Sequence, residues 1–275
     1  MIRFFSGLWI FVWHDIGPRQ VLDVMDVMRL RTSTETFVRH LDWICGYFNI
    51  VNESQALDLA RGGVSKGRYA WLTFDDGYKG IARYAAPILH QRGCPFTIFL
   101  NSVSFEKKLM MRSRCTWLNN HYPFLPSLGD LPKKSFVWPG SVDVVQAMWN
   151  KLNTCREDSL VDLIHCDESD VELIRNLGGG IGNHTRHHWP LSRLPWRVVE
   201  AEITSWGVKC SKPTSPWLAI PYGELEHRNE MVGSIIRSNG MVELLGTYGK
   251  VDKEPYRRVD LSERRHPWTV TRGWK

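Results

Sequence analysis

The sequence predicts an α/β fold built on a parallel sheet or barrel, and three observations support this prediction. Short apolar runs, typical of strands that are buried on both faces, recur along the chain. Segments with apolar residues at helical spacing lie between these runs, and such alternation is typical of parallel sheets. The third observation is size and composition: 275 residues, 43% hydrophobic and 23% charged, suit one large globular domain.

The expected elements follow in chain order. We expect strands at residues 8–13, 69–74, 95–100, 178–182, 217–221, 242–247 and 257–261. We expect helices at residues 34–48, 81–91, 142–152, 167–177, 196–206 and 226–238. Ser33 or Thr34 can cap the first helix, and Gly93 can end the second. Residues 104–139 are rich in Pro, Lys, Arg and turn residues, so we interpret them as an insertion within a single domain of residues 1–275.

Charge and hydropathy exclude several classes of protein. The chain has 35 Lys and Arg against 29 Asp and Glu, and no aromatic-interleaved basic motif accompanies its C-terminal arginines, so we expect no nucleic-acid partner. The apolar run at residues 8–13 is far shorter than the ~20 residues of a transmembrane helix, and no signal-type cleavage site follows it. The six cysteines include no C-x-x-C pair, so we expect reduced thiols and a cytoplasmic protein.

Polar side chains that could take part in catalysis or metal binding directly follow the predicted strands. Active sites of parallel α/β proteins gather at the carboxyl ends of the strands, where the loops converge. We therefore expect one site that includes residues from five strand ends: His14 with Asp15, Asp75 with Asp76, Asn101, His184 and Tyr222.

The segment Thr-Phe-Asp-Asp-Gly at residues 73–77 is the first candidate motif. Two adjacent carboxylates repel each other and are costly to keep ionised unless a cation offsets them. Gly77 permits a sharp turn that lets Asp75 and Asp76 serve different purposes. A polar turn that caps a helix would use the same residue types, so the motif has a purely structural alternative.

The second and third motifs follow later strands. His184 and His188 are four positions apart, so on a helical turn both rings would project from one face and could hold one divalent ion. Thr185 can cap this turn, and we interpret His187 as structural. The run Pro-Tyr-Gly at residues 221–223 predicts a rigid turn, either unremarkable or able to present a backbone N–H as an oxyanion hole requires.

Together these motifs resemble the polysaccharide deacetylase family, or NodB-homology domain. T-F-D-D-G is complete at residues 73–77, H-[ST]-x-x-H is complete at residues 184–188, and R-x-P-[FY]-G is met except that Ala219 replaces its arginine. The resemblance spans about residues 8–223. It implies a distorted (β/α) barrel and a divalent metal, most commonly Zn²⁺, held by Asp76, His184 and His188.

The resemblance also implies catalytic roles. Asp75 would be the general base that activates water for attack on an N-acetyl carbonyl, and the backbone N–H of Tyr222 would stabilise the oxyanion. In the family, the arginine that Ala219 replaces orients the base. Arg257 or Arg258 can substitute for it, and both are candidates to contact a phosphate-bearing or acidic saccharide.

Two further features depart from the family pattern or extend beyond it. The last family motif, L-x-x-H, which supplies the general acid, has no clean match, so His266 and His14 are the candidates. Trp189, directly after a candidate metal ligand, can line a sugar site. Aromatic residues of the insertion can line the cleft or simply pack onto the barrel: Trp117, Tyr122, Phe124 and Trp138.

The implied function is metal-dependent removal of an N-acetyl group from an amino sugar. The expected substrate is a nucleotide- or lipid-linked precursor in surface polysaccharide biosynthesis of the O-antigen type. Two alternatives stay open: a deacetylase-like barrel that binds a saccharide without turnover, and a hydrolase of another amide or imide.

Overall fold

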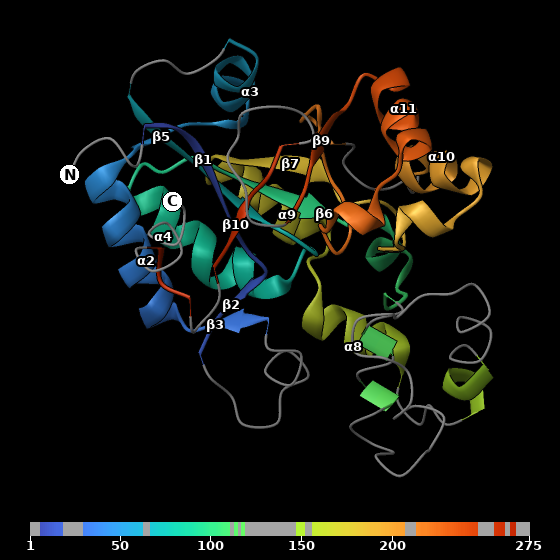
Figure 1. The fold of residues 1–275 in the computed structure, drawn as a ribbon. Helices are drawn as coiled ribbons and strands as arrows, with labels where there is room; N and C mark the ends of the chain where they lie inside the picture. Colours follow the sequence, from blue (N-terminus) through green and yellow to red (C-terminus); the bar gives the residue numbers. More distant parts are fainter. Residues whose placement is uncertain are drawn as a thin grey trace.

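The computed structural model describes residues 6–18, 30–62, 67–110, 113–114, 117–118, 147–151, 156–206, 213–246, 256–261 and 265–267. Its centre is an eight-stranded parallel sheet with the order β10-β1-β5-β6-β7-β8-β9, in which β4 also pairs with β5 (Figure 1). The strands are β1 (Gly7–Trp13), β4 (Asn49–Ile50), β5 (Arg68–Phe74), β6 (Phe96–Leu100), β7 (Gly179–Asn183), β8 (Trp217–Ala219), β9 (Val242–Leu244) and β10 (Val259–Asp260). A second sheet pairs β2 (Asp15–Ile16) with β3 (Arg31–Thr32). Every strand predicted from the sequence overlaps a strand of the main sheet.

The main sheet curls until its two edges meet. Tyr256 forms a parallel bridge with Leu244 of β9, and its carbonyl accepts a 2.7 Å hydrogen bond from the Leu245 amide. The same segment then enters β10, where Val259 pairs with Phe11 of β1. One short stretch of chain therefore joins both edges, which confirms the distorted (β/α) barrel.

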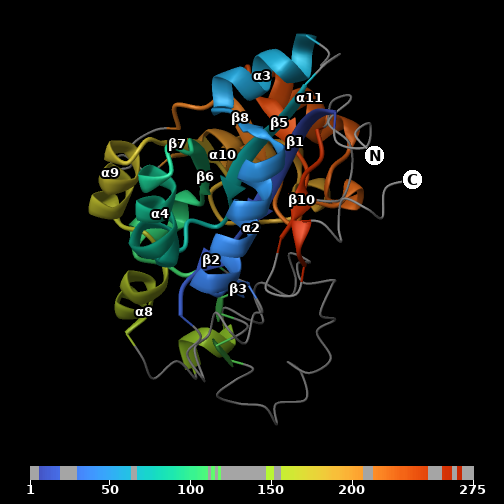
Figure 2. The same cartoon turned by 90° about the vertical axis from the view of Figure 1, so that its left-hand side faces the viewer.

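Helices pack around the sheet or at its two ends (Figures 1 and 2). They are α2 (Thr34–Tyr47), α3 (Glu53–Gly62), η2 (Ile81–Ala85), α4 (Ala86–Gln91), α8 (Glu157–Ile164), α9 (Glu168–Asn176), α10 (Trp196–Thr204) and α11 (Glu230–Ser238). The sequence did not predict α3 and α8. The helix expected at residues 81–91 begins as a π-helix, and the one expected from residue 226 begins at Glu230, after a 3₁₀ turn. Of the helix expected at residues 142–152, only residues 147–151 are described, and these are helical.

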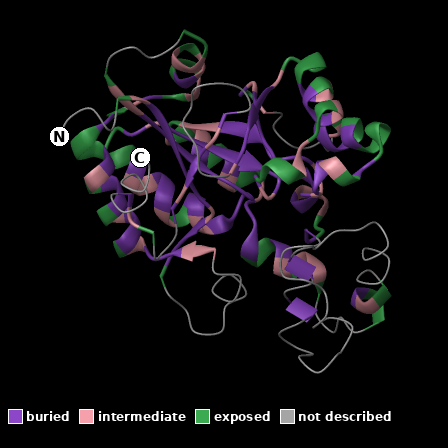
Figure 3. Ribbon diagram, viewed as in Figure 1, coloured by how far each residue is buried: buried purple, intermediate pink, exposed green. Residues whose placement is uncertain are grey.

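Alternation along β1 explains the two apolar layers. Trp9, Phe11 and Trp13 face the layer between the sheet and α2, whereas Leu8 and Ile10 face the barrel interior. A strand buried on both faces needs apolar residues at every position, which is why it reads as a continuous apolar run. Figure 3 shows this burial along the central strands.

The barrel interior is closed at the amino ends of its strands by the start of α3. Glu53 accepts a 2.9 Å hydrogen bond from Thr97 Oγ1, and its backbone carbonyl accepts one of 3.1 Å from Trp217 Nε1. Burial raises the pKa of Glu53 more than the Thr97 hydrogen bond lowers it. The candidate site residues Asp75, Asp76 and His184 lie at the opposite, carboxyl ends of the strands. No helix in the described ranges is long and apolar enough to cross a bilayer.

Candidate active site

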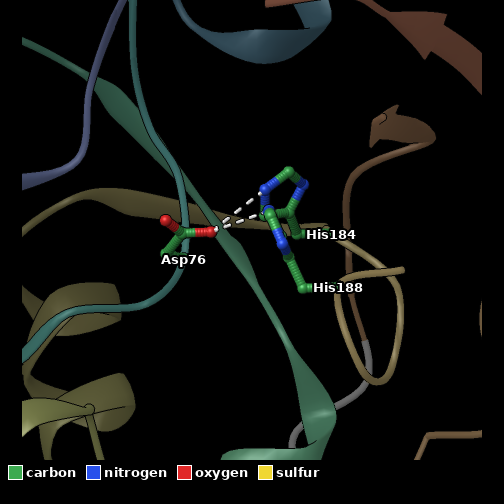
Figure 4. Close-up of side chains that lie close together, drawn as sticks. All are labelled: Asp76, His184 and His188. Atoms are coloured by element: carbon green, nitrogen blue, oxygen red, sulfur yellow. Dashed lines mark ion pairs between the residues drawn. The ribbon is translucent and has the colours of Figure 1, made fainter. Parts of the chain in front are cut away.

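The three predicted metal ligands lie together at the carboxyl ends of the strands. Asp76 follows β5, and His184 and His188 belong to the loop after β7. Figure 4 shows the carboxylate of Asp76 pointing at both imidazole rings. Asp76 Oδ1 lies 3.3 Å from His184 Nε2 and 3.2 Å from His188 Nε2, and all three side chains are buried. His184 and His188 follow Asp76 by 108 and 112 positions in the chain, yet all three side chains lie in one small volume.

This cluster fits a single divalent cation. The three ligand atoms all lie within 4.8 Å of one another, and Asp76 Oδ1 is buried with no hydrogen-bond donor in the part of the chain that the structure describes. A tetrahedral ion with bonds of 2.0–2.2 Å separates its ligand atoms by roughly 3.3–3.6 Å, which is close to the two distances from Asp76 Oδ1 to the histidine nitrogens. One oxygen and two imidazole nitrogens leave a coordination position for water or substrate, as catalytic zinc sites do.

Hydrogen bonds behind the rings set their orientation. His184 Nδ1 lies 2.8 Å from the carbonyl oxygen of Ala219, which can only accept, so Nδ1 carries a proton. In the neutral ring, Nε2 then presents its lone pair toward Asp76, the arrangement common among metal-ligating histidines. Burial alone would raise the pKa of Asp76, but the nearby rings of His188 and His184 hold it well below its usual value.

The loop of residues 184–188 corrects one expectation. It is not a helical turn: Thr185 has φ of 67° and His188 has φ of 60°, both in the left-handed region. Thr185 Oγ1 does cap the loop, because it accepts a 3.2 Å hydrogen bond from the His188 amide. Asn101, at the end of β6, donates to the carbonyls of His184 (2.5 Å) and Thr185 (3.2 Å). The rings meet through these contacts and not through helical spacing.

Asp75 sits beside the cluster and is paired with an arginine. Arg258 Nη1 and Nη2 lie 2.7 and 2.6 Å from the two oxygens of Asp75, and both residues are buried. Arg258 Nε also donates to the Leu245 carbonyl at 3.0 Å. Asp75 Oδ2 is 3.8 Å from His184 Nε2. The family motif has an arginine at the position of Ala219. In this chain the arginine that contacts Asp75 is Arg258, directly before β10.

This pair keeps Asp75 ionised. Burial alone would raise its pKa, but Arg258, then His184 and His14, outweigh burial and lower the pKa below its usual value. The structure places Arg258, and not its neighbour Arg257, against Asp75; Arg257 is only half-buried. Arg258 is fully buried, so its guanidinium serves this carboxylate.

The two candidate acids occupy different places. His14 directly follows β1, and the parallel pairing of Trp13 with Phe74 places it at the same end of the sheet as Asp75 and Asp76. His266 instead packs against α2, with its ring 5.5 Å from that of His40 and 6.1 Å from that of Trp43.

Of the other candidates, Tyr222 contacts the cluster, whereas Trp189 packs against a neighbouring apolar cluster. Tyr222 has φ of 62°, and its ring centroid lies 4.7 Å from that of His188. Trp189 lies with its ring 6.3 Å from that of His187, whose Nδ1 is bonded to the buried Glu202 at 2.5 Å.

Of the insertion aromatics, Trp117 is buried and packs on Trp149 at 5.3 Å, as its packing alternative anticipated. Tyr122, Phe124 and Trp138 lie outside the described residues. Sequence reasoning missed Glu202, and it missed His165, whose Nδ1 is 3.3 Å from the Asp76 carbonyl. Burial lowers the pKa of His165 to about 4, and no sequence motif marks it.

Comparison with known proteins agrees with this geometry. The polysaccharide deacetylase family model matches residues 62–243. The fold is similar to that of IcaB from Ammonifex degensii (TM-score 0.65, 19% identity, 96% of each chain covered). It is also similar to Streptococcus pyogenes deacetylase PplD in complex with acetate (0.61, 14%, 98% of each). A third similar structure is the BpsB deacetylase domain from Bordetella bronchiseptica (0.55, 15%, covering 95% of this chain and 97% of that one). Among curated proteins, none matches the sequence.

These likenesses confirm the NodB-type barrel. The family model covers the strands that carry both aspartates, both histidines and the Pro-Tyr-Gly turn. The chain therefore belongs to the polysaccharide deacetylase family.

Proposed function

We propose that this protein is a metal-dependent hydrolase that removes the N-acetyl group of an amino sugar. One observation carries the proposal: the Asp76, His184 and His188 cluster lies beside a second, ionised carboxylate in a chain of this family. A purely structural metal site would need neither an open coordination position nor the adjacent Asp75.

The donor set suits Zn²⁺ and other divalent transition ions. When bound, such an ion supplies a Lewis acid that polarises a carbonyl oxygen and promotes ionisation of water. Asp76, His184 and His188 would hold it. Asp75, kept ionised and oriented by two hydrogen bonds from Arg258, would accept a proton from the attacking water.

The leaving nitrogen needs a proton when its bond to the acetyl carbon breaks. His14, which directly follows β1 at the same end of the sheet as both carboxylates, is the proposed general acid, so the products are acetate and a free amine. The backbone N–H of Tyr222 would stabilise the oxyanion from the strained turn that follows β8.

Acetate release from N-acetylated sugars, together with metal content per chain, tests this proposal. We expect about one divalent ion per chain, with metal and activity both lost in Asp76→Asn. Asp158→Asn, at an aspartate outside the site whose side chain is 43% exposed, is the matched control and should retain both. Full activity of Asp76→Asn would contradict the assigned roles, and metal binding without acetate release from any donor would favour a saccharide-binding protein.

The finer substrate is also part of the proposal. We favour a nucleotide- or lipid-linked precursor of a surface polysaccharide, and the cytoplasmic location remains a prediction from the sequence. A panel that includes free oligosaccharides, carrier-linked sugars and simple amides or imides separates these substrates. The Asp75–Arg258 pair weakens the binding-only alternative, because it supplies the base-orienting arginine that the sequence lacks at Ala219.

A further inference from the structure

The turn that carries Asp76 is held by two residues outside the three motifs. Asp76 has φ of 68°, a conformation that is unfavourable for residues other than glycine. Three successive carbonyl oxygens of this turn have donors from residues 165–166. His165 Nδ1 lies 3.3 Å from Asp76 O, the Cys166 amide 2.9 Å from Gly77 O, and Cys166 Sγ 3.4 Å from Tyr78 O.

The supporting segment is itself well anchored. It links α8 to α9, and the His165 amide donates to the Val161 carbonyl at 2.8 Å where α8 ends. Asp167 then caps α9 through a reciprocal capping box with Asp170. Lys79, three positions after Asp76, lies 3.1 Å from Asp167 Oδ2 and 3.2 Å from Asp170 Oδ2. Lys79 Nζ also donates to the Asp162 carbonyl at 2.8 Å, so turn and support are tied together on both sides of His165.

The chemistry of the ring is more informative than its packing. His165 is 1% exposed and stacks on Tyr78 with ring centroids 5.2 Å apart. Because a carbonyl oxygen only accepts, Nδ1 is the protonated nitrogen. Nε2 is buried without a hydrogen-bond partner among the described residues. A buried, unpaired ring nitrogen is unfavourable, so an aromatic or aliphatic side chain would fill this space at lower cost if packing were the only role.

We propose that His165 is a positioning residue for the metal site. Its Nδ1–H bond to the Asp76 carbonyl holds Asp76 in the left-handed conformation that directs the carboxylate at His184 and His188. The inference rests on the proposed function, since the residue being positioned is a proposed metal ligand. Hydrogen-bonded groups that orient metal ligands typically change metal affinity or activity by ~10–100-fold when they are mutated.

Metal affinity of the full chain tests this role without measuring activity. His165→Asn keeps an N–H donor at the δ position, whereas His165→Phe keeps a stacking ring and His165→Leu keeps bulk, both without the donor. Ile174→Ala, a fully buried residue of α9, controls for general loss of stability. Zn²⁺ and Co²⁺ affinities come from competition with a chelating dye, the Co²⁺ absorption spectrum reports ligand geometry, and melting of the metal-free proteins reports folding.

We expect affinities roughly 10–100-fold weaker for His165→Phe and His165→Leu, with an altered Co²⁺ spectrum. His165→Asn and Ile174→Ala should stay within about threefold of the wild type, a change well below that range. Wild-type affinity in both donor-free variants, or equal losses in His165→Asn, would overturn this inference alone. A wild-type protein that binds neither ion would overturn the proposed function and this inference with it.

Discussion

The buried pair of Asp75 and Arg258 allows a quantitative test of how the site is built. Arg258→Met removes the guanidinium but keeps much of the side-chain length. The two contacts it removes, of 2.7 and 2.6 Å, join residues that are 4% and 0% exposed. Loss of one partner of a buried ion pair costs about 3–5 kcal/mol, because the other charge stays buried. His184 and His14 also lower the pKa of Asp75, so we expect a loss near the lower end, about 3 kcal/mol.

A double-mutant cycle separates the pair from general damage. Asp75→Asn leaves the guanidinium buried without its counterion, whereas Asp75→Asn with Arg258→Met leaves no buried charge at this position. Urea unfolding, monitored in chelator so that metal does not contribute, gives the four free energies of unfolding. The double variant should lose less than the sum of the single losses by about 2–3 kcal/mol, near the upper end of measured couplings. Additive losses would refute the pairing.

Relocation of the arginine tests its role in the reaction. Ala219 lies in the interior cluster with Phe99, and the Arg258 guanidinium sits over the Phe99 ring at 5.5 Å. Ala219→Arg should therefore restore part of the acetate release that Arg258→Met loses. Ala219→Arg alone should lower stability, because two guanidinium groups would then compete for one site. A double variant less active than Arg258→Met would show that the two positions do not serve the same carboxylate.

Three further outcomes are expected. Chelation should lower the melting temperature of the wild type but not of Asp76→Asn, because an ion at 100 times its Kd stabilises the folded state by about 2.7 kcal/mol; equal shifts in calorimetry would contradict the site. The folded-state pKa of Glu53 is raised, so the stability it contributes is complete below the unfolded value of about 4.3 and is lost as pH rises through the folded value. The free energy of unfolding of Glu53→Gln, measured in urea, should therefore increase relative to that of the wild type as pH rises. A difference between the two that does not change with pH would count against this. Gly223→Ala should cost about 1–3 kcal/mol more than Gly240→Ala. Both glycines have positive φ, but only a Cβ at Gly223 would meet backbone, 2.2 Å from Gly246 N; equal losses would show that the turn relaxes.

The strands and the metal cluster could be predicted because their signals are local. A strand buried on both faces leaves a continuous apolar run, and the two motifs each follow such a run. The parallel sheet then brings their carboxyl ends to one side, whatever the number of residues between them. Helix α3 gave a weaker signal, because Ala56 is its one buried residue and its larger apolar residues, Leu57 and Leu59, are only partly buried.

Other features depend on register, which the sequence does not state. The sequence alone does not distinguish Arg257 from Arg258 as the partner of Asp75. Successive residues of an extended chain point to opposite sides, so only one of the two can face the barrel interior. Because Val259 pairs with Phe11 of β1, Arg258 enters the barrel and meets Asp75. In the same way, spacing of four suggested a helix at His184, whereas the observed loop has left-handed residues. Spacing limits which geometries are possible, but long-range contacts choose among them.

Backbone strain marks the site independently of its chemistry. Among the described residues other than glycine, five have positive φ: Asp76, Lys107, Thr185, His188 and Tyr222. All but Lys107 belong to the cluster or its loops. Such conformations cost about 1–3 kcal/mol each and persist only where surrounding contacts hold them. These four residues lie in the loops that follow β5, β7 and β8, so side chains from separate strands meet at the same end of the barrel. The strain is thus a consequence of bringing the ligands together, and the buried hydrogen bonds around it are what make that arrangement stable.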